Sequence, residues 1–219
     1  MPRDKLRLLD ATPTTTTTDR RRKPAARMSS VGRLESMARA GVDGRHWYAT
    51  AAVNVVSAAR ILGCSPEWFA AVLGVTSPRV HVSRNVRLSV AYAIDGSTAG
   101  TMPMVRVGLA KLSAIGGRHC QDLDGMTATM GPKTGPFARA LAGDLDAVVL
   151  DVWMARALGV DQSQFSHKPT HRKACDRIRQ VADRLGWRPA EVQAAIWTAA
   201  YRAHYTDATV PQFTISLDA

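Results

Sequence analysis

Hydrophobic residues recur every three or four positions along most of the chain from Ser30 onwards. This spacing places them on one face of an α-helix. Residues that typically end or begin helices separate these apolar stretches. Gly63 follows one of them, and Ser65 and Pro66 begin the next as its N-cap and first-turn proline. The pattern predicts helices over residues 46–63, 65–75, 76–96, 104–117, 133–143, 151–160, 167–186 and 188–205.

For three of these helices the spacing also indicates which side is buried. A helix that packs on a core presents its apolar stripe inwards and its charged residues outwards. The expected buried positions are Val53, Val56, Ala59 and Ile61 or Leu62 in the first, Val82, Val86, Val90 and Ala93 in the second, and Val192, Ile196 and Ala199 or Ala200 in the third.

Strand-like alternation is confined to residues 210–217, VPQFTISL, and is modest even there. The chain has no internal repeat and no G-x-x-x-x-G-K phosphate-binding loop. Ala, Val and Leu supply most of the hydrophobic share, and aromatic residues make up only 6%, which favours helix. We therefore predict an all-α fold of roughly eight to ten helices.

Residues 1–29 lack the helical period and contain a threonine run and a basic cluster at 20–23. This composition predicts a disordered basic tail, followed by one folded domain over 30–219. The tail is either a sequence-independent tether to phosphates or simply a solvated segment.

The net charge is +11, of which +5 falls in residues 1–27, so the remainder is basic as well. An excess of this size favours a polyanionic partner such as nucleic acid. A basic surface that serves only solubility is the alternative.

Cysteine usage points to an intracellular protein. Cys64, Cys120 and Cys175 lie far apart without C-x-x-C spacing, which predicts reduced thiols. We find no signal peptide and no apolar run of 18 residues, so we expect no membrane association and a cytoplasmic location. The Ala-, Arg-, Val- and Asp-rich composition suggests a high-GC bacterium or a cell infected by its phage.

The histidines do not form a recognisable metal-binding pattern. His167 and His171 are the only pair four residues apart, and Pro169 between them argues against a shared helical face. We expect no metal and no other cofactor. The basic stretch HKPTHRK at 167–173 is interpreted as a DNA-facing loop or a polar linker.

One stretch, GPKTGPFARALAGDLDAVVLD at 131–151, combines a lysine at the mouth of a helix with an aspartate at the start of the next. Pro136 is tolerated only in a first turn, so this helix should begin near Lys133 to Gly135 and stop at Gly143. The helix dipole disfavours the charged form of Lys133, and burial would favour the neutral amine that a nucleophile needs. Asp151 is a natural N-cap, which would explain its presence without catalysis.

These residues resemble the core of the helix-hairpin-helix DNA glycosylases, the endonuclease III superfamily. GPKT at 131–134 is similar to the end of the family's hairpin, and LDVW at 150–153, with Arg156 beyond, is similar to its aspartate segment. The separation of 18 residues between Lys133 and Asp151 agrees with the family's layout. The resemblance covers about residues 105–160, reaches upstream into VLGVTSPRVHVSRNVRLSV, and is absent from the tail.

The resemblance implies a two-lobed fold, with the hairpin lobe at about 75–160 and the other helices in the second lobe. It also implies a monomer that acts on duplex DNA with the target base flipped out of the stack. Lys133 would attack the sugar C1′ and form a Schiff base that permits strand β-elimination, the abasic-site lyase reaction. Asp151 would stabilise oxocarbenium character and accept the proton of the nucleophile. The activity implied is base excision, in DNA repair or in the handling of a modified base.

The hairpin departs from the family pattern in two places. Thr129 stands where the family usually has a glycine, and Gly135-Pro136 after the lysine is unusual. Gly131 can still bring its backbone close to a phosphate, and with Thr134 it is a candidate DNA-binding residue.

Further candidate residues surround this motif. Each can contact DNA or simply belong to a solvated face, and they are Arg79, Arg84, Arg87, Arg118 and His119, with His81 beside the first three. Trp47, Tyr48 and Trp153 are expected in the core rather than as stacking platforms.

Three other functions remain open at this point. The chain could be a DNA-binding module without catalysis, or an enzyme on the same scaffold that transfers a group to a modified base. It could also be an unrelated helical protein that binds a protein partner.

Overall fold

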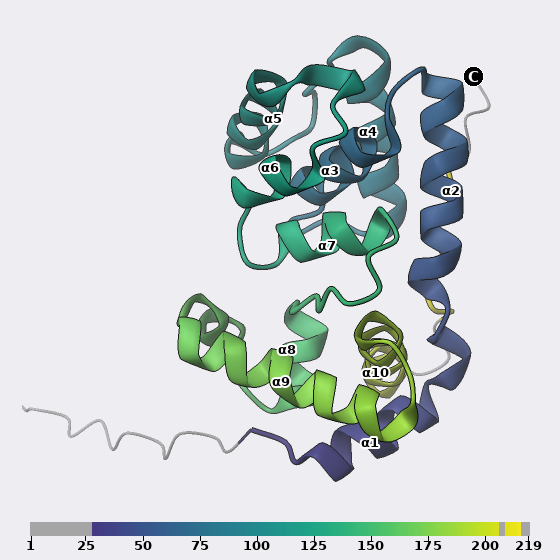
Figure 1. Ribbon diagram of the computed structural model, residues 1–219, viewed down its shortest axis with the longest axis vertical. Coiled ribbons are helices and arrows are strands. Elements are labelled where there is room, and N and C mark those ends of the chain that lie inside the picture. Colours follow the sequence, from purple (N-terminus) through teal and green to yellow (C-terminus); the bar gives the residue numbers. More distant parts are fainter. Residues whose placement is uncertain (1–27, 206–208, 216–219) are drawn as a thin grey trace, which may run out of the picture.

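The computed structural model describes residues 28–205 and 209–215, which contain ten α-helices and three short 3-10 helices (Figure 1). The α-helices are α1 Val31–Ala40, α2 Trp47–Leu62, α3 Pro66–Thr76, α4 Val82–Asp95, α5 Pro103–Ile115, α6 Leu123–Ala128, α7 Thr134–Leu141, α8 Val152–Leu158, α9 Lys168–Leu185 and α10 Pro189–His204. The 3-10 helices are η1 Val42–Gly44, η2 Gly117–His119 and η3 Gln162–Ser166. The all-α prediction is confirmed for the described residues.

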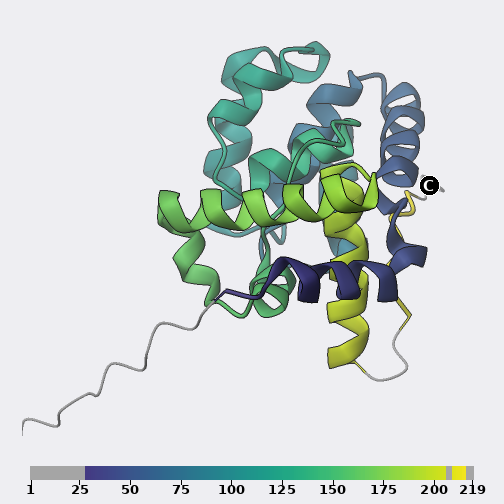
Figure 2. The ribbon, with the colours of Figure 1, turned by 60° about the horizontal axis from the view of Figure 1, so that its bottom comes forward.

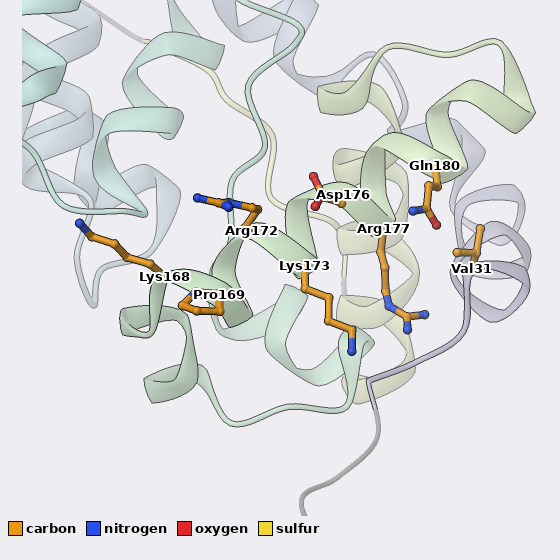
Figure 3. A pocket seen from close by; sticks show the side chains of 8 residues that line it. All are labelled: Val31, Lys168, Pro169, Arg172, Lys173, Asp176, Arg177 and Gln180. Carbon is orange, nitrogen blue, oxygen red and sulfur yellow. The ribbon is translucent and has the colours of Figure 1, made fainter.

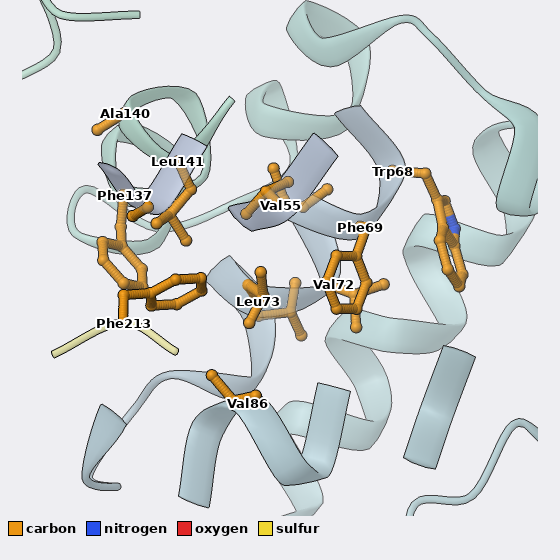
Figure 4. Close-up of a cluster of buried hydrophobic side chains, with 14 of the residues drawn as sticks. Val55, Trp68, Phe69, Val72, Leu73, Val86, Phe137, Ala140, Leu141 and Phe213 are labelled. Atoms are coloured by element: carbon orange, nitrogen blue, oxygen red, sulfur yellow. The ribbon is translucent and has the colours of Figure 1, made fainter. Parts of the chain in front are cut away.

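Helix α3 is the centre of one group of helices. Every residue from Trp68 to Thr76 is buried, and α3 contacts α2, α4, α5, α6 and α7. Its sequence is apolar on all sides, as expected of a helix enclosed by others. Phe69 and Leu73 are fully buried at the middle of this core (Figure 4).

A second core lies among α1, α8, α9 and α10, the lower group in Figure 1. Its buried side chains include Leu34 of α1, Met154 of α8, Ile178 of α9 and Ile196 of α10. Figure 2 shows α9 and α1 running roughly alongside one another, each crossing α10. Helix α10 joins the two cores, since Ala194 belongs to the first and Ile196 to the second.

The connection between α7 and α8 also joins the two cores. Ala147 and Val149 belong to the first hydrophobic cluster, and Val148 and Leu150 belong to the second. Successive side chains of an extended chain point to opposite sides, so this short segment is buried on both. It leads directly into Asp151.

The division into lobes differs from the expected one. Helices α2 and α3 pack with α4 to α7, although the hairpin lobe was expected to start only near residue 75. Helix α8 packs on α10 in the other group, although the hairpin lobe was expected to extend to about 160. Helix α3 joins this group because it is apolar on all sides, and α2 with α4 to α7 covers its surface.

The expected buried face of α2 is wrong except at Ala59, which is buried, and Leu62, which is half-buried. Val53, Val56 and Ile61 are exposed, at 65%, 49% and 71%. Ala51, Val55 and Ala58 face the core in place of these three residues, beside Ala59. Small side chains allow close helix approach, and periodicity alone could not rank them above the larger valines.

The strand expected near the end of the chain and the loop expected at residues 167–173 are both wrong. Residues 209–215 form no strand; they run as an irregular segment in which Val210 and Phe213 are buried. The stretch HKPTHRK is not a loop but opens α9, with Pro169 in the first turn, where a proline is tolerated.

Residues 28 and 29, which were assigned to the predicted tail, pack against the folded domain. Residues 1–27 lie outside the described part, but Met28 is buried and Ser29 is tied to α8. The Ser29 N–H donates to the Leu158 carbonyl at 2.8 Å, and its Oγ donates to the Ala157 carbonyl at 2.9 Å. Residues 28 and 29 therefore belong to the folded part.

Three properties bear on the expected surroundings of the protein. Cys64, Cys120 and Cys175 are free thiols, with Cys175 buried. Across the described part of the chain, none of the helices has both the length and the apolar character needed to cross a bilayer. In the same residues, no three or more His, Cys, Asp or Glu side chains gather as metal ligands would.

Candidate active site

The start of α7 is fixed by a close approach to α3. A Cβ on Gly74 would lie 2.9 Å from the Thr134 carbonyl oxygen and 2.9 Å from the Ala138 Cβ, so only glycine fits here. As predicted, α7 begins beside Lys133, with Pro136 in its first turn, and it ends at Leu141, before Gly143. This packing holds Lys133 against the end of α3.

The Lys133 amine is held by Ser77, the residue that follows α3. Lys133 Nζ donates to Ser77 Oγ at 2.6 Å, and Ser77 Oγ donates in turn to the Gly74 carbonyl at 2.8 Å. The same Nζ lies 4.6 Å from the centroid of the Phe137 ring. Because the Ser77 proton is used by Gly74, the hydroxyl can only accept from the lysine, whether the amine is charged or neutral.

Burial lowers the pKa of Lys133 from 10.5 to about 8, although the negative charge of Asp151 acts in the opposite direction. With a pKa of about 8, about a tenth of the amine is neutral at pH 7, far more than for an exposed lysine. The sequence-based expectation of a partly neutral amine is consistent with this environment.

Asp151 caps α8, as predicted. Its Oδ1 accepts from the backbone N–H groups of Trp153 and Met154, each at 3.0 Å, and its Oδ2 accepts from Trp197 Nε1 at 3.2 Å. Burial raises the pKa of Asp151, against these hydrogen bonds and the charge of Lys133. Asp151 and Lys133 are therefore close enough for each to influence the ionisation of the other.

Tyr48 of α2 packs near both Lys133 and Asp151. Its ring packs edge-on against Phe137, with centroids 6.3 Å apart, and Phe137 in turn lies under the Lys133 amine. Burial, and then the charge of Asp151, raise the pKa of Tyr48 well above its usual value, so the phenol stays neutral. The expectation that Tyr48 is a core residue is confirmed, because its side chain is 5% exposed.

A cavity of about 150 Å³ opens beside Lys133. Its walls come from the loop before α7, the end of the α7–α8 connection, η3 and the start of α9, through Pro132, Leu150, Phe165 and His171. It is smaller than ordinary ligand pockets, which measure about 300–1,000 Å³.

Gly131 and Thr134 form a closed turn before α7. The Gly131 N–H donates to Thr134 Oγ1 at 3.1 Å. This amide would have to exchange Thr134 for a phosphate in order to bind DNA. A Cβ on Gly131 would meet only Thr134 Oγ1, at 3.7 Å, so the free protein does not itself require glycine there.

The five other candidate residues lie in the first group of helices, at different places. Arg79 follows Ser77 closely in the chain and has a left-handed backbone, with φ 59°. Arg84 and Arg87 are exposed on α4. Arg118 donates to the Leu62 carbonyl at the end of α2, which makes it a structural residue, and His119 beside it is exposed.

Sequence reasoning missed three residues that the structure brings to Lys133 and Asp151. Ser77 and Trp197 form hydrogen bonds with the Lys133 amine and the Asp151 carboxylate, and His171 lines the small cavity together with Lys133. They come from positions 56 residues before Lys133, 46 after Asp151 and 38 after Lys133. No local signal marks them, because each is brought in by helix packing.

A model described as Family of unknown function (DUF7178) matches residues 14–204, most of the chain. The chain belongs to this family. No curated protein and no solved structure matches the chain. The family match therefore covers both groups of helices and both Lys133 and Asp151, but its description assigns them no role.

Proposed function

We propose that this protein is a DNA glycosylase that excises a damaged or modified base and cleaves the abasic site through a lysine Schiff base. The observation that carries the proposal is that half-buried Lys133, with a pKa of about 8, and half-buried Asp151 each influence the ionisation of the other. They lie at the two ends of the segment from α7 to α8, and Lys133 lines a cavity. The sequence resemblance to helix-hairpin-helix glycosylases at 131–134 and 150–153 supports the same assignment.

In the proposed reaction the neutral Lys133 amine attacks C1′ of the flipped nucleotide. A C1′–N bond forms while the bond from C1′ to the base breaks, and its electron pair leaves with the base. Asp151 accepts the proton that the amine releases. The sugar ring then opens: the nitrogen lone pair forms the C1′=N bond of the Schiff base, the C1′–O4′ bond breaks, and O4′ takes the proton from Asp151. The Schiff base makes the 2′-hydrogen acidic, so that loss of this proton expels the 3′-phosphate by β-elimination.

The charge balance of the chain supports DNA as the substrate. The net charge of +11 favours a polyanion, and the base must leave the stack before the glycosidic bond can be reached. A flipped base would lie at the cavity beside Lys133 after η3 or α9 has moved.

The test is borohydride trapping on duplex DNA that contains an abasic site. We expect a covalent adduct with the wild type and with Lys111→Ala, whose lysine is exposed on α5. Lys133→Ala should give no adduct.

An adduct that persists in Lys133→Ala would assign the nucleophile to another amine. The absence of any adduct, together with salt-sensitive DNA binding, would contradict the lyase assignment. Such a result would favour a monofunctional, group-transfer or purely binding protein.

A further inference from the structure

A second cavity, of about 540 Å³, lies along α9, and four cationic side chains line it. They are Lys168, Arg172, Lys173 and Arg177 (Figure 3). We propose that this cavity is a binding site for the phosphate groups of a ligand. The site uses neither Lys133 nor Asp151, so it stands or falls independently of the proposed glycosylase chemistry.

The four cations lie on the half of α9 away from its buried residues, and in Figure 3 Lys168 and Arg172 extend to a different side from the other two. Lys168 and Arg172 are four residues apart, and so are Lys173 and Arg177, which makes each pair neighbours on the helix surface. The opposite face carries buried apolar residues such as Ile178. In Figure 3, Lys173 and Arg177 extend to the same side of α9, towards the segment that leads into α1.

This arrangement of charges works against the stability of α9 itself. Like charges four residues apart repel one another, and cations in the first turns oppose the helix dipole. The first turn of α9 contains no acidic residue that would offset them. Local rules broken in this way are expected at functional sites, where a bound anion supplies the missing negative charge.

The cavity contains almost no compensating charge. Asp176 is its one acidic lining residue, and the ion pair it forms is with Arg179, at 3.4 Å, outside the lining. Within residues 28–205 and 209–215, none of the four lining cations takes part in an ion pair. Phosphate oxygens are the natural partners of such a cluster.

Arg177 is already fixed in place at the cavity. Its Nη1 donates to the Ser29 carbonyl at 2.6 Å, and Ser29 is itself tied to the end of α8. Its Nε is buried and has no hydrogen-bond partner within the described part of the chain. A guanidinium that is already held in place loses little conformational entropy when it binds an anion.

The same phosphate chemistry can come from two sources. A free molecule with a phosphate chain, such as a nucleoside triphosphate, suits the volume of the cavity. A DNA strand could also supply backbone phosphates, because His171, next to Arg172, contacts the Pro132 carbonyl of the Lys133 loop at 3.4 Å. The cationic face therefore begins beside the candidate active site.

The test compares two double variants that remove the same charge. Lys168→Gln/Lys173→Gln changes the cavity but leaves the Arg177–Ser29 bond intact. Arg60→Gln/Lys111→Gln changes exposed cations on α2 and α5. For each full-length protein we would measure calorimetric binding of inorganic tripolyphosphate, and anisotropy of a labelled DNA duplex across a salt series.

If the cavity takes a free phosphate chain, tripolyphosphate binds the wild type and the control, and binds the cavity variant about tenfold more weakly or worse. If it takes backbone phosphates, tripolyphosphate binds poorly, and the slope of log K against log salt for DNA falls by about 2 in the cavity variant alone. Equal behaviour of the two variants with both probes would overturn the proposal. Borohydride trapping should be retained by the cavity variant at low salt, which separates this result from a failure of the glycosylase assignment.

Discussion

Lys133 lies in an environment very different from that of a lysine in water. Burial disfavours the charged amine, whereas the Phe137 ring and the carboxylate of Asp151 favour it. Burial is the larger effect, so the pKa falls to about 8. A fraction of the amine is therefore neutral near pH 7. When the amine is protonated, its buried charge destabilises the folded protein.

The free-energy cost of burying the charged Lys133 amine predicts a pH-dependent difference in stability between the wild type and Lys133→Met. The folded pKa lies below the unfolded value of 10.5, so the unfolded chain binds more protons between about pH 8 and 10.5. Wild-type stability should therefore rise with pH in that window relative to the variant. Urea unfolding from pH 7 to 10 should show Lys133→Met as the more stable protein at pH 7, with a gain that shrinks above pH 8.

Lys111→Met serves as the control for this experiment, because Lys111 is exposed. A Lys133→Met difference that stays constant with pH would mean that the amine is not desolvated in the folded protein.

The hydrogen bond between Lys133 and Ser77 could not be predicted from the residues around either one. Nothing in the sequence near Ser77 indicates that α7 will bring a lysine to it.

At the scale of single elements, the local signals that begin and end helices were reliable. Ser65 caps α3 and Asp151 caps α8, and Gly63 ends α2 with a left-handed φ of 64°. Such signals act through hydrogen bonds and backbone conformations within a few residues, so the sequence contains them in full. Which face of α2 is buried depended on its neighbours, and the larger valines misled the prediction.

Asp151 has two roles that a pair of variants can separate. Asp151→Asn keeps an oxygen that can cap α8, whereas Asp151→Ala removes it, and both remove the charge and the acceptor for Trp197. We expect Asp151→Ala to be less stable than Asp151→Asn by about 1 kcal/mol, the usual value of an N-cap. Chemical unfolding of the two variants measures this difference.

Base excision should be lost to a similar extent in both Asp151 variants if the carboxylate is catalytic. An Asp151→Asn protein with wild-type excision would leave Asp151 as a cap alone. Equal stability of the two variants would instead show that the cap contributes little to the folded state.

At the scale of the whole molecule, α10 and the segment before α2 hold the two groups of helices together. Arg45, just before α2, donates to both carboxylate oxygens of Glu191 on α10, at 3.0 and 3.1 Å. Glu191 also accepts from the Arg188 N–H at 2.8 Å. Burial alone would raise the pKa of Glu191, but these bonds outweigh it and the pKa is lowered.

Glu191→Gln should therefore destabilise the protein at neutral pH and less so in acid. A carboxyl whose pKa is lower in the folded protein stabilises the fold at pH values above its unfolded pKa of 4.5. This stabilisation is lost as the pH falls through the folded pKa. We expect a loss of about 1–3 kcal/mol at pH 7, typical of hydrogen bonds to a charged group. Urea unfolding at pH 7 and pH 3 should show the gap closing at the lower pH.

Glu35→Gln gives the comparison, since Glu35 pairs with Arg39 of α1 and Arg184 of α9, whose side chains are largely exposed. Exposed ion pairs contribute little to stability. If the two glutamate variants lost the same stability at pH 7, the Arg45–Glu191 pair would have no special part in joining the helices.

The sequence by itself determined the helical class, most helix limits, the cap at Asp151 and the position of Lys133 at a helix start. Each of these follows from interactions within one or two turns of the chain. Only the tertiary structure decided which helices share a core, that α2 buries its alanines, and that Ser77, Tyr48 and Trp197 surround the two charges. Those outcomes depend on how apolar surfaces distant in sequence cover one another, and on the burial that this covering imposes on Lys133 and Asp151.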